Sequence, residues 1–300
     1  MASKLQLICQ IAFAGLRARL SRRPTRLAIL AGAGELPRIA AETARARGLQ
    51  FILYHITEAD LDQQLNADQQ IIRRSISLGN IGQTLQYLQQ DKITEVILLG
   101  KIEKQRLLQD VERDKCANEI YDKAADRRDD TLFLQFAAVL ATMGIKILRQ
   151  KELLPGCFLK PGIHTRKKPE DKVLVGDIEF GYELSRKVGS LDIGQTAVVF
   201  EKMVLAVEAI EGTDAAIRRA GAIMRATGSR QRAAAGCVCK TGKASQDPRF
   251  DLPAVGLRTL ETMAESGLQC LVLEAAQTLV VNPAAFIARA DELDLIVVAR

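Results

Sequence analysis

The sequence predicts an α/β protein of two domains, a parallel-sheet domain followed by a second domain with mixed strand directions. Short apolar runs alternate with segments of helical spacing along most of the chain, which is typical of α/β folds. The 300 residues exceed the usual size of a single domain. A stretch rich in proline and glycine, KELLPGCFLKPGIHTRKKP, interrupts the alternation near the middle and indicates a connector.

The first domain is predicted over residues 26–150. It opens with the apolar run RLAILA, a turn with two glycines, the helical segment LPRIAAETARAR and a second apolar run, LQFILYHI. Further strands are predicted in IIRRSISLG, ITEVILLG and IKILRQ, and helices in NIGQTLQYLQQD and DDTLFLQFAAVLATMG. Because a crossover helix between two strands leaves the strands parallel, this order predicts a doubly wound sheet.

Residues 151–165 are predicted to be a linker, and residues 166–300 form the second domain. Its first helix is predicted in EDKVLVGDIEFGYELSRKVG, and a hairpin is predicted to pair 196–200 with 203–209. A helix to about residue 226 and a strand in GCVCK follow. Helices and strands then alternate to the C-terminus in LRTLETMAESG, LQCLVLEA, QTLVV, PAAFIARADE and DLIVVA. A hairpin among crossover units predicts mixed strand directions.

The net charge of +6 gives little support to nucleic-acid binding. Residues 1–24 contain five lysines and arginines and no acid, so the rest of the chain is close to neutral. The chain has no tryptophan and no interleaved basic and aromatic residues of the kind that stack bases. No apolar run reaches the ~18 residues that a membrane-spanning helix needs. We therefore predict no nucleic-acid partner and no membrane span.

Residues 1–25 are predicted to lie outside the fold. In this segment arginines follow an apolar stretch, which is a poor match to a secretory signal. Two interpretations stay open. The segment is either an amphipathic helix on an anionic membrane surface or an extension without a role in the fold.

Cysteines and histidines restrict the chemistry. The six cysteines are scattered, which favours a reduced, cytoplasmic protein. Cys237 and Cys239 are predicted to share one face of a strand, but two thiolates do not complete a zinc site. His55 and His164 are the only histidines and have no partner at metal-ligand spacing. Hydrolytic chemistry would therefore have to use carboxylates, a divalent metal and basic residues.

Two turns in the first domain are candidates for contact with a nucleotide or phosphate. AGAGELP, with Gly32 and Gly34, lies between a predicted strand and helix, where glycines let backbone N–H groups approach a phosphate. The dinucleotide fingerprint is incomplete because Pro37 takes the place of the third glycine. Lys101 follows the strongest strand and would point toward the ligand edge of a doubly wound sheet. The alternatives are a tight turn without ligand and a solvated lysine.

The stretch EAIEGTDAAIRRAG gathers carboxylates at the end of the predicted hairpin. Gly212 permits a positive φ, Thr213 is a suitable N-cap and Asp214 suits the first helical turn. Capping does not explain why Glu208 and Glu211 also stand there. Hard oxygen ligands close together are what Mg²⁺ prefers, so the stretch is a candidate metal site.

The loop KTGKASQDPRFDLPAVG is the second polar concentration. Lys240, Lys243 and Arg249 stand near Asp247 and Asp251, an arrangement that can hold both a metal and the phosphates it bridges. Asp251 precedes Leu-Pro, a pair that favours an extended backbone. The alternative is an ordinary loop with paired surface charges.

Four segments together resemble the LpxI family, the UDP-2,3-diacylglucosamine pyrophosphatases of lipid A biosynthesis. They are LAGAGELP, LDIGQTAVVF, VLAVEAIEGTDAAIRRAG and QDPRFDLPAVG, and the likeness runs from about Arg26 to Arg300. The resemblance implies a Rossmann-like N-terminal domain, a distinct α/β C-terminal catalytic domain and a substrate held in the cleft between them. It also implies Mg²⁺-dependent hydrolysis of UDP-2,3-diacylglucosamine to UMP and 2,3-diacylglucosamine 1-phosphate, with water attacking the sugar-side phosphorus.

The resemblance also implies a role for Asp251, and the polar concentrations of the sequence supply the other candidate site residues. Asp251 in RFDLP matches the family's essential acid. The expected ligands of Mg²⁺, or of another divalent cation such as Mn²⁺, are Asp251, Glu208, Glu211 and Asp214. The residues expected to contact substrate or phosphate are Gly32, Gly34, Glu35, Lys101, Gln195, Gly212, Thr213, Lys240, Lys243 and Arg249.

The chain departs from the family pattern at four positions. Arg128 and Ala276 stand where glycine is usual, Asn282 where aspartate is usual, and Ala244 where proline is usual. None of these changes removes a carboxylate from the two polar concentrations. They affect the expected details of the substrate pocket more than the expected reaction.

Two other functions stay open from the sequence. The glycine turn could serve a nucleotide-dependent NAD(P) oxidoreductase, or the chain could be a lipid or nucleotide binder without catalysis. The expected partner is a lipid nucleotide, and the chain could form a homo-oligomer. The protein is expected in the cytoplasm. Its basic N-terminal segment could bring it to the cytoplasmic face of the inner membrane.

Overall fold

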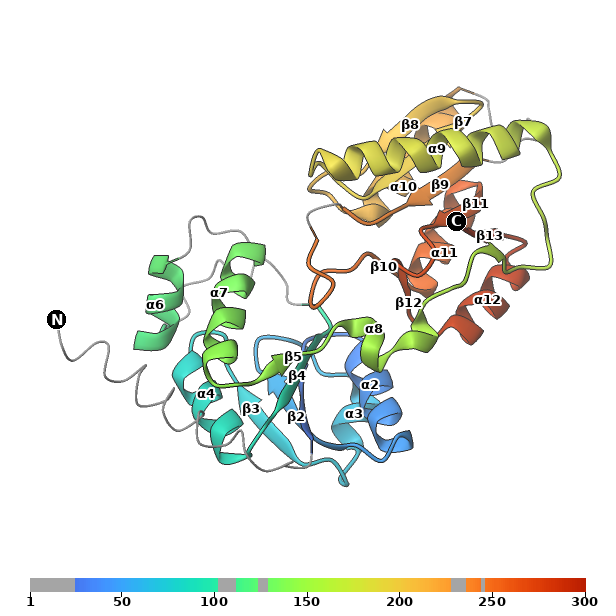
Figure 1. The fold of residues 1–300 in the computed structure, drawn as a ribbon. Helices are drawn as coiled ribbons and strands as arrows, with labels where there is room; N and C mark the ends of the chain where they lie inside the picture. Colours follow the sequence, from blue (N-terminus) through green and yellow to red (C-terminus); the bar gives the residue numbers. More distant parts are fainter. Residues whose placement is uncertain (1–24, 102–111, 124–128, 228–235, 244–245) are drawn as a thin grey trace. The chain divides into compact units, whose positions relative to one another are not determined.

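The computed structural model describes residues 25–101, 112–123, 129–227, 236–243 and 246–300 (Figure 1). The N-terminal segment, Arg128 and Ala244 therefore lie outside the described residues. The chain forms two compact units. The first contains the chain up to Leu154 together with Pro248–Phe250, and the second contains Pro155–Asp247 and Asp251–Arg300.

The first unit is a parallel sheet with helices on both faces, as the sequence predicts. The strand order is β3-β2-β1-β4-β5, and every pair of neighbours is parallel. The elements in chain order are β1 (Arg26–Ala31), α2 (Leu36–Ala46), β2 (Gln50–Ile56), α3 (Gln63–Ala67), β3 (Arg73–Ile76), α4 (Ile81–Gln90), β4 (Glu95–Leu99), α6 (Lys115–Lys123), α7 (Asp129–Thr142), β5 (Lys146–Ile147) and α8 (Gln150–Leu153). The short helices α3 and α8 were not predicted from the sequence.

Alternation along the strands separates the two faces of this sheet. Ala28 and Leu30 of β1 belong to a core cluster that includes side chains of α4, α6 and α7, whereas the buried alanines of α2 lie against β1 and β2 from the other face (Figure 1). Strands buried on both faces read as continuous apolar runs, which is why RLAILA and ITEVILLG are recognisable in the sequence.

The second unit holds a mixed sheet of order β6-β13-β11-β9-β7-β8. Strands β9, β11 and β13 are parallel to one another. Strand β6 pairs antiparallel with β13, and β7 pairs antiparallel with both β9 and β8, the latter pair being the predicted hairpin. Its main elements are β6 (Gly162–Ile163), α9 (Lys172–Ser190), β7 (Thr196–Phe200), β8 (Met203–Val207), α10 (Thr213–Ala226), β9 (Gly236–Lys240), α11 (Leu257–Ser266), β11 (Leu268–Leu273), α12 (Pro283–Glu292) and β13 (Ile296–Ala299). A small two-stranded sheet pairs β10 (Ala254–Val255) with β12 (Leu279–Val280).

Two boundaries in the second unit differ from the prediction. Strand β6 falls inside the predicted linker and pairs with β13, because an edge strand of two residues carries too little pattern to be read. Thr213 is not the N-cap but the first helical residue of α10. The N-cap position is Gly212, whose φ of +84° is open to glycine at little cost.

Helix α9 covers one face of the mixed sheet, and the core on the other face includes side chains of α10, α11 and α12 (Figure 1). Gly181 lets α9 approach closely, because a Cβ there would stand 2.6 Å from Cys239 Sγ. Cys237 and Cys239 share a face of β9, with their sulfurs 3.4 Å apart. Burial is the main cause that raises the pKa of the Cys237 thiol well above its ordinary value. The five described cysteines are free thiols.

A buried carboxylate of α9 stabilises the β7–β8 hairpin. Glu201 and Lys202 form its two-residue turn with φ of +49° and +60°, values that usually call for asparagine or glycine. Asp177 is fully buried and accepts the N–H groups of Glu201 at 2.8 Å and Lys202 at 2.6 Å. The buried acid therefore satisfies both backbone donors of a turn that lacks the usual turn residues.

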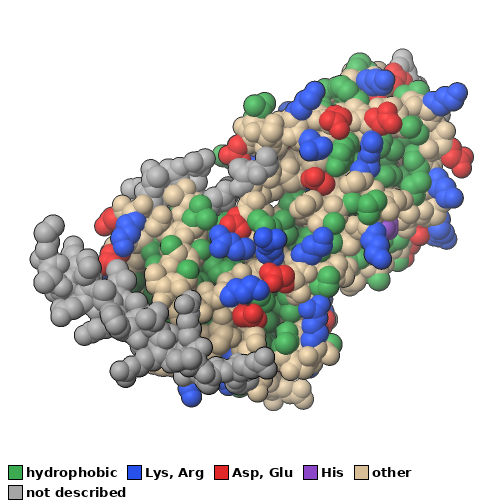
Figure 2. All heavy atoms as spheres, viewed as in Figure 1, with side chains coloured by type: hydrophobic (Ala, Val, Ile, Leu, Met, Phe, Trp, Pro, Cys, Tyr) green, Lys and Arg blue, Asp and Glu red, His purple; other side chains and the backbone are tan. Residues whose placement is uncertain are grey.

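Figure 2 shows lysine and arginine side chains interspersed with acidic and apolar ones on the visible face. Within the described ranges, no helix has both the length and the apolar character that crossing a bilayer demands.

Candidate active site

The first unit brings two turns together at the carboxyl ends of β1 and β4. The N–H of Gly32 donates to Leu99 O at 2.8 Å, and Ala33 and Lys101 exchange backbone hydrogen bonds at 2.8 and 2.9 Å. A Cβ on Gly32 would stand 2.7 Å from Lys101 O. A Cβ on Gly100, whose φ is +91°, would stand 2.6 Å from the carbonyl carbon of Gly32. The contact is therefore available only to glycine on both sides.

This place is the switch point of the sheet. Strand β1 lies between β2 and β4, so the chain winds away from β1 in both directions, and ligands of doubly wound sheets bind outside this point. Gly34, with φ of +98°, is exposed and leads into α2. The structure thus groups Gly32, Gly34 and Lys101. Glu35 is half-exposed and pairs with Arg38 at 3.0 Å.

The carboxylate that a dinucleotide site would need after β2 has other contacts. Glu58 accepts hydrogen bonds from Leu78 N–H at 3.0 Å and from the Thr57 hydroxyl at 3.0 Å. It thereby ties the loop after β2 to the loop after β3. Pro37 stands in the first turn of α2 and Glu58 is engaged with the protein, so both positions depart from the dinucleotide pattern.

The second unit builds a chain of side chains at the carboxyl end of β9. Lys240 is buried, and its Nζ donates to Thr213 Oγ1 at 2.6 Å. The Thr213 hydroxyl in turn donates to Glu208 Oε1 at 3.0 Å. The structure thus joins the two polar concentrations of the sequence, because Glu208 and Thr213 come from the first and Lys240 from the second.

One carboxylate oxygen of Glu208 is available to bind a ligand. Its Oε2 is buried and has no hydrogen-bond partner among the described residues. The same is true of Thr241 Oγ1 and Gln246 Nε2. A buried polar atom without a partner costs free energy, so such atoms are normally satisfied by water, an ion or a ligand. The three atoms lie on the loops that leave β8 and β9, where a polar ligand would satisfy them.

A third loop, residues 191–195, packs against both of these loops. A Cβ on Gly194 would stand only 1.9 Å from the carbonyl oxygen of Glu208, so glycine is required for this contact. Thr241 N–H donates to Gln195 O at 3.0 Å. The predicted residue Gln195 therefore contributes its backbone, next to the loop that carries Lys240.

The other two acids of the EAIEGTDAAIRRAG stretch face arginines. Glu211 pairs with Arg219 at 2.7 Å, and Asp214 pairs with Arg258 at 2.9 Å. Hydrogen bonds from its own backbone N–H and from that of Ala209, together with the Arg219 charge, lower the pKa of Glu211. Both acids are therefore engaged with protein groups.

The structure does not gather the predicted metal ligands into one group. In the part of the chain that is described, no cluster of three or more His, Cys, Asp or Glu side chains could hold a metal ion. That part includes all four predicted ligands, Asp251, Glu208, Glu211 and Asp214. Glu208 Oε2 fits a cation as a buried oxygen without a partner, whereas Glu211 and Asp214 already face cations.

Asp251 lies on the loop after β9. Its N–H donates to Asp247 O at 3.0 Å, which closes a turn over Pro248–Phe250. Arg249 lies within this turn, and its guanidinium is 5.9 Å from the centre of the Phe250 ring. Two residues beyond Asp251, Pro253 approaches to 4.0 Å from the position of a Cβ on Gly242.

Sequence reasoning missed three polar residues of the second unit. Asp192 accepts from Lys243 Nζ at 2.8 Å, and Glu274 Oε2 accepts from Gly242 N–H at 2.8 Å. The buried Thr196 hydroxyl lies 3.4 Å from that of Thr213. Glu274 could have been found, because it directly follows the buried strand LQCLVL and so falls at the carboxyl edge of the sheet.

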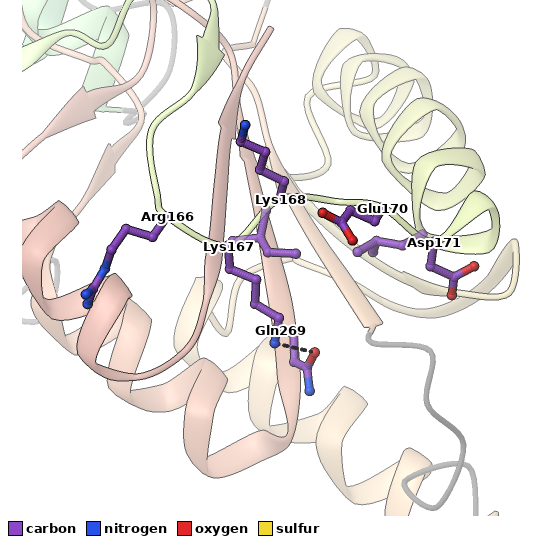
Figure 3. A pocket seen from close by; sticks show the side chains of 8 residues that line it. Arg166, Lys167, Lys168, Glu170, Asp171 and Gln269 are labelled. Atoms are coloured by element: carbon purple, nitrogen blue, oxygen red, sulfur yellow. Dashed lines mark hydrogen bonds between the residues drawn. The ribbon is translucent and has the colours of Figure 1, made fainter.

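A separate cavity of about 480 Å³ lies at the opposite edge, where β11 and β13 begin (Figure 3). Lys167 Nζ bonds Asp294 Oδ2 at 2.5 Å and Gln269 Oε1 at 3.4 Å, so its charge is paired. None of the predicted site residues lines this cavity. The lining residues are Arg166, Lys167, Lys168, Glu170, Asp171, Leu174, Gln269 and Ile296.

These features define a class, that of two-unit α/β proteins with a glycine-turn edge on one sheet and an acid–hydroxyl–lysine chain on the other. Comparison with known proteins gives the family. Residues 26–157 match the LpxI N-terminal domain, and residues 160–298 match the LpxI C-terminal domain. The UDP-2,3-diacylglucosamine pyrophosphatase LpxI of Caulobacter vibrioides (strain ATCC 19089 / CIP 103742 / CB 15) is 32% identical over 278 residues, which cover 91% of this chain and 96% of that protein. The chain belongs to the LpxI family, and it is a hydrolase.

Proposed function

We propose that this protein hydrolyses UDP-2,3-diacylglucosamine to UMP and 2,3-diacylglucosamine 1-phosphate in lipid A biosynthesis. The observation that supports this reaction best is the chain from Lys240 through Thr213 to Glu208, with its unpartnered buried oxygen, in a member of the LpxI family. The oxidoreductase alternative is set aside because the family is one of hydrolases and Glu58 has other contacts.

The reaction adds one water across the diphosphate. A bond forms between the water oxygen and one phosphorus, and the bond from that phosphorus to the bridging oxygen breaks. The bridging oxygen leaves with the other phosphate, and the protons of water are shared between the products and solvent. Attack at either phosphorus yields the same two products, so the assignment to the sugar-side phosphorus stays a prediction from the family.

Cations of the second unit are suited to hold the diphosphate. The negative charges of the diphosphate repel an incoming water, and positive groups in a partly dry site reduce that repulsion. Lys240 is buried with its ammonium on Thr213, and Lys243 reaches the same set of loops through Asp192. We expect Lys240 to hold a phosphate oxygen and Lys243 to assist at the rim.

We propose a divalent cation, Mg²⁺ or Mn²⁺, with Glu208 and Asp251 as its protein ligands. Mg²⁺ usually keeps several waters and binds through one or two carboxylates plus substrate phosphates, so a site with few protein ligands suits it. Such an ion would withdraw charge from the phosphates. Asp251 either ligates the ion or orients the water. Glu211 and Asp214 then act as partners of Arg219 and Arg258 rather than as ligands.

Exposed apolar side chains offer a surface for the acyl chains. Leu191 and Ile193 are well exposed, and Ile210 is fully exposed. Their loops abut, because Gly194 lies against the backbone of Glu208. Apolar side chains exposed together mark contact surfaces for proteins, membranes or ligands, and the acyl chains of a lipid nucleotide are such a ligand. We propose that they contact the acyl chains of the bound substrate.

The proposed setting is the cytoplasm, at the inner-membrane surface where a lipid nucleotide would be met. The basic segment before residue 25 would supply the membrane contact, as predicted from its arginines. A homo-oligomer is also proposed, and size-exclusion chromatography with light scattering would test it.

The deciding experiment is incubation of the full chain with UDP-2,3-diacylglucosamine and Mg²⁺, with UMP as the readout. We expect UMP release that EDTA abolishes and that Mg²⁺ or Mn²⁺ restores. Asp251→Ala should still bind the lipid nucleotide but release no UMP. Binding without UMP release by the unaltered chain under any divalent metal would indicate the non-catalytic alternative. Reaction in ¹⁸O-labelled water would show which phosphorus is attacked.

A further inference from the structure

The loop that carries Asp251 leaves its own unit for three residues. Asp247 and Asp251 belong to the second unit, whereas Pro248–Phe250 between them belongs to the first. The hydrogen bond from Asp251 N–H to Asp247 O, 3.0 Å long, closes this excursion at its base. A residue of catalytic interest thus sits where the chain re-enters its unit.

The excursion is anchored by an aromatic stack. The ring of Phe250 lies 4.8 Å from that of Phe133 on α7, with an angle of 20° between the planes. Phe250 also packs against the core cluster between the sheet and helices α4, α6 and α7. Stacked aromatic pairs add a preferred geometry to simple burial, so the stack fixes where the ring lies and how it is turned.

Other contacts support the same three residues. Pro248 O accepts from Gln150 N–H at 3.4 Å, and the side-chain amide of the buried Gln150 donates to Leu98 O of β4 at 3.0 Å. Proline at 248 restricts the backbone at the start of the excursion. The loop is therefore tied at both ends of its three residues to the core of the first unit.

We propose that Phe250 is a positioning residue that holds the Asp251 carboxylate through the stack on Phe133. This inference rests on the proposed hydrolysis, in which Asp251 serves the reaction. One peptide bond separates the two residues, so a ring that lost its place would let the acid next to it move. Displacing a catalytic group by about 1 Å can cost about 100-fold in rate.

Kinetics test the positioning role. Phe250→Ala should lower kcat by about 10- to 100-fold and leave KM for the lipid nucleotide within about threefold. Phe133→Ala should do the same, and the double variant should be little worse than either single one because both remove one stack. Phe250→Tyr keeps an aromatic ring and should restore most of kcat.

A matched control separates positioning from loss of stability. Met143 follows α7 and packs on the same core cluster but is not part of the aromatic stack. Met143→Ala should lower the melting temperature to a similar degree and keep kcat within about twofold. Equal loss of kcat in Met143→Ala, or normal kcat in a folded Phe250→Ala protein, would overturn the proposal.

Hydrogen exchange tests the anchor without any substrate. The Asp251 amide should exchange slowly in the unaltered chain and at least about tenfold faster in Phe250→Ala and Phe133→Ala, but not in Met143→Ala. Unchanged exchange in the two stack variants would overturn the anchor. If the unaltered chain releases no UMP, the proposed hydrolysis fails, and the exchange result still decides whether the stack holds the loop.

Discussion

The carboxyl edges of the two sheets are built from different material. In the first unit the edge is backbone, with two glycine turns in contact at the ends of β1 and β4. In the second unit it is side chain, with Lys240, Thr213 and Glu208 joined in series. A backbone edge can cradle a phosphate but cannot move a proton, whereas carboxylates can bind a cation or activate water. Under the proposed function, we therefore expect the first unit to contribute recognition and the second to contribute chemistry.

Substitution of Glu208 should have the largest effect on kcat and is the most direct test of this expectation. Glu208→Gln should lower kcat for UMP release by about 10²- to 10³-fold, or about 3–4 kcal/mol, because it removes the charge at the unpartnered buried oxygen. Glu211→Gln is the matched control, since that acid is exposed and paired with Arg219. It should change kcat by less than about fivefold. Comparable losses in both variants would contradict this expectation.

The glycine contact of the first unit comes next. Gly100→Ala should destabilise the chain by about 2–4 kcal/mol, because φ is +91° and the new Cβ would meet the Gly32 carbonyl. Gly34→Ala also has a positive φ but meets no atom within 4 Å, so it should cost only about 1–2 kcal/mol. Urea unfolding of the full chain measures both. Equal costs would show that the close approach contributes nothing.

Asp91 of the first unit has a structural role, which unfolding measured as a function of pH tests. Asp91 accepts from Arg74 and from the buried Tyr54 hydroxyl, and these hydrogen bonds lower its pKa. Its stabilising effect is therefore complete above the unfolded pKa of about 4 and is lost as pH falls through the lower folded pKa.

Asp91→Asn should thus be about 1–2 kcal/mol less stable than the unaltered chain at pH 7, and the gap should narrow below about pH 4. Urea unfolding across pH 3 to 7 measures this gap. A gap that widens toward low pH would reverse the inferred sign. UMP release at pH 7 by the folded variant should stay near normal, because Asp91 lies between α4 and the start of β4, whereas the glycine turns lie at the carboxyl ends of β1 and β4.

The smallest effect is expected at one strained position of the second unit. Ala276 has a φ of +59°, where glycine is usual in the family pattern described above. Ala276→Gly should stabilise the chain by about 0.5–1 kcal/mol, because glycine adopts this conformation without a steric penalty. Thermal unfolding measures it, and Ala275→Gly, one residue earlier with no positive φ, should destabilise instead.

Sequence patterns predicted the parallel sheet well because its strands are buried on both faces and appear as apolar runs. The glycine turn after β1 was equally readable, since glycines between a strand and a helix have a direct physical meaning. The partners of individual side chains were not readable. Nothing in the spacing of Glu208, Glu211 and Asp214 says that the last two face arginines while the first keeps a free oxygen, because Arg258 and Lys240 arrive from other elements.

Because of the excursion at Pro248–Phe250, no single cut in the chain separates the two units completely. A fragment ending at Leu154 would lack the ring that stacks on Phe133, and a fragment starting at Pro155 would expose a phenylalanine to water. We therefore expect each of these two fragments to give little soluble protein when expressed alone. Co-expression of both fragments should increase the soluble yield of each.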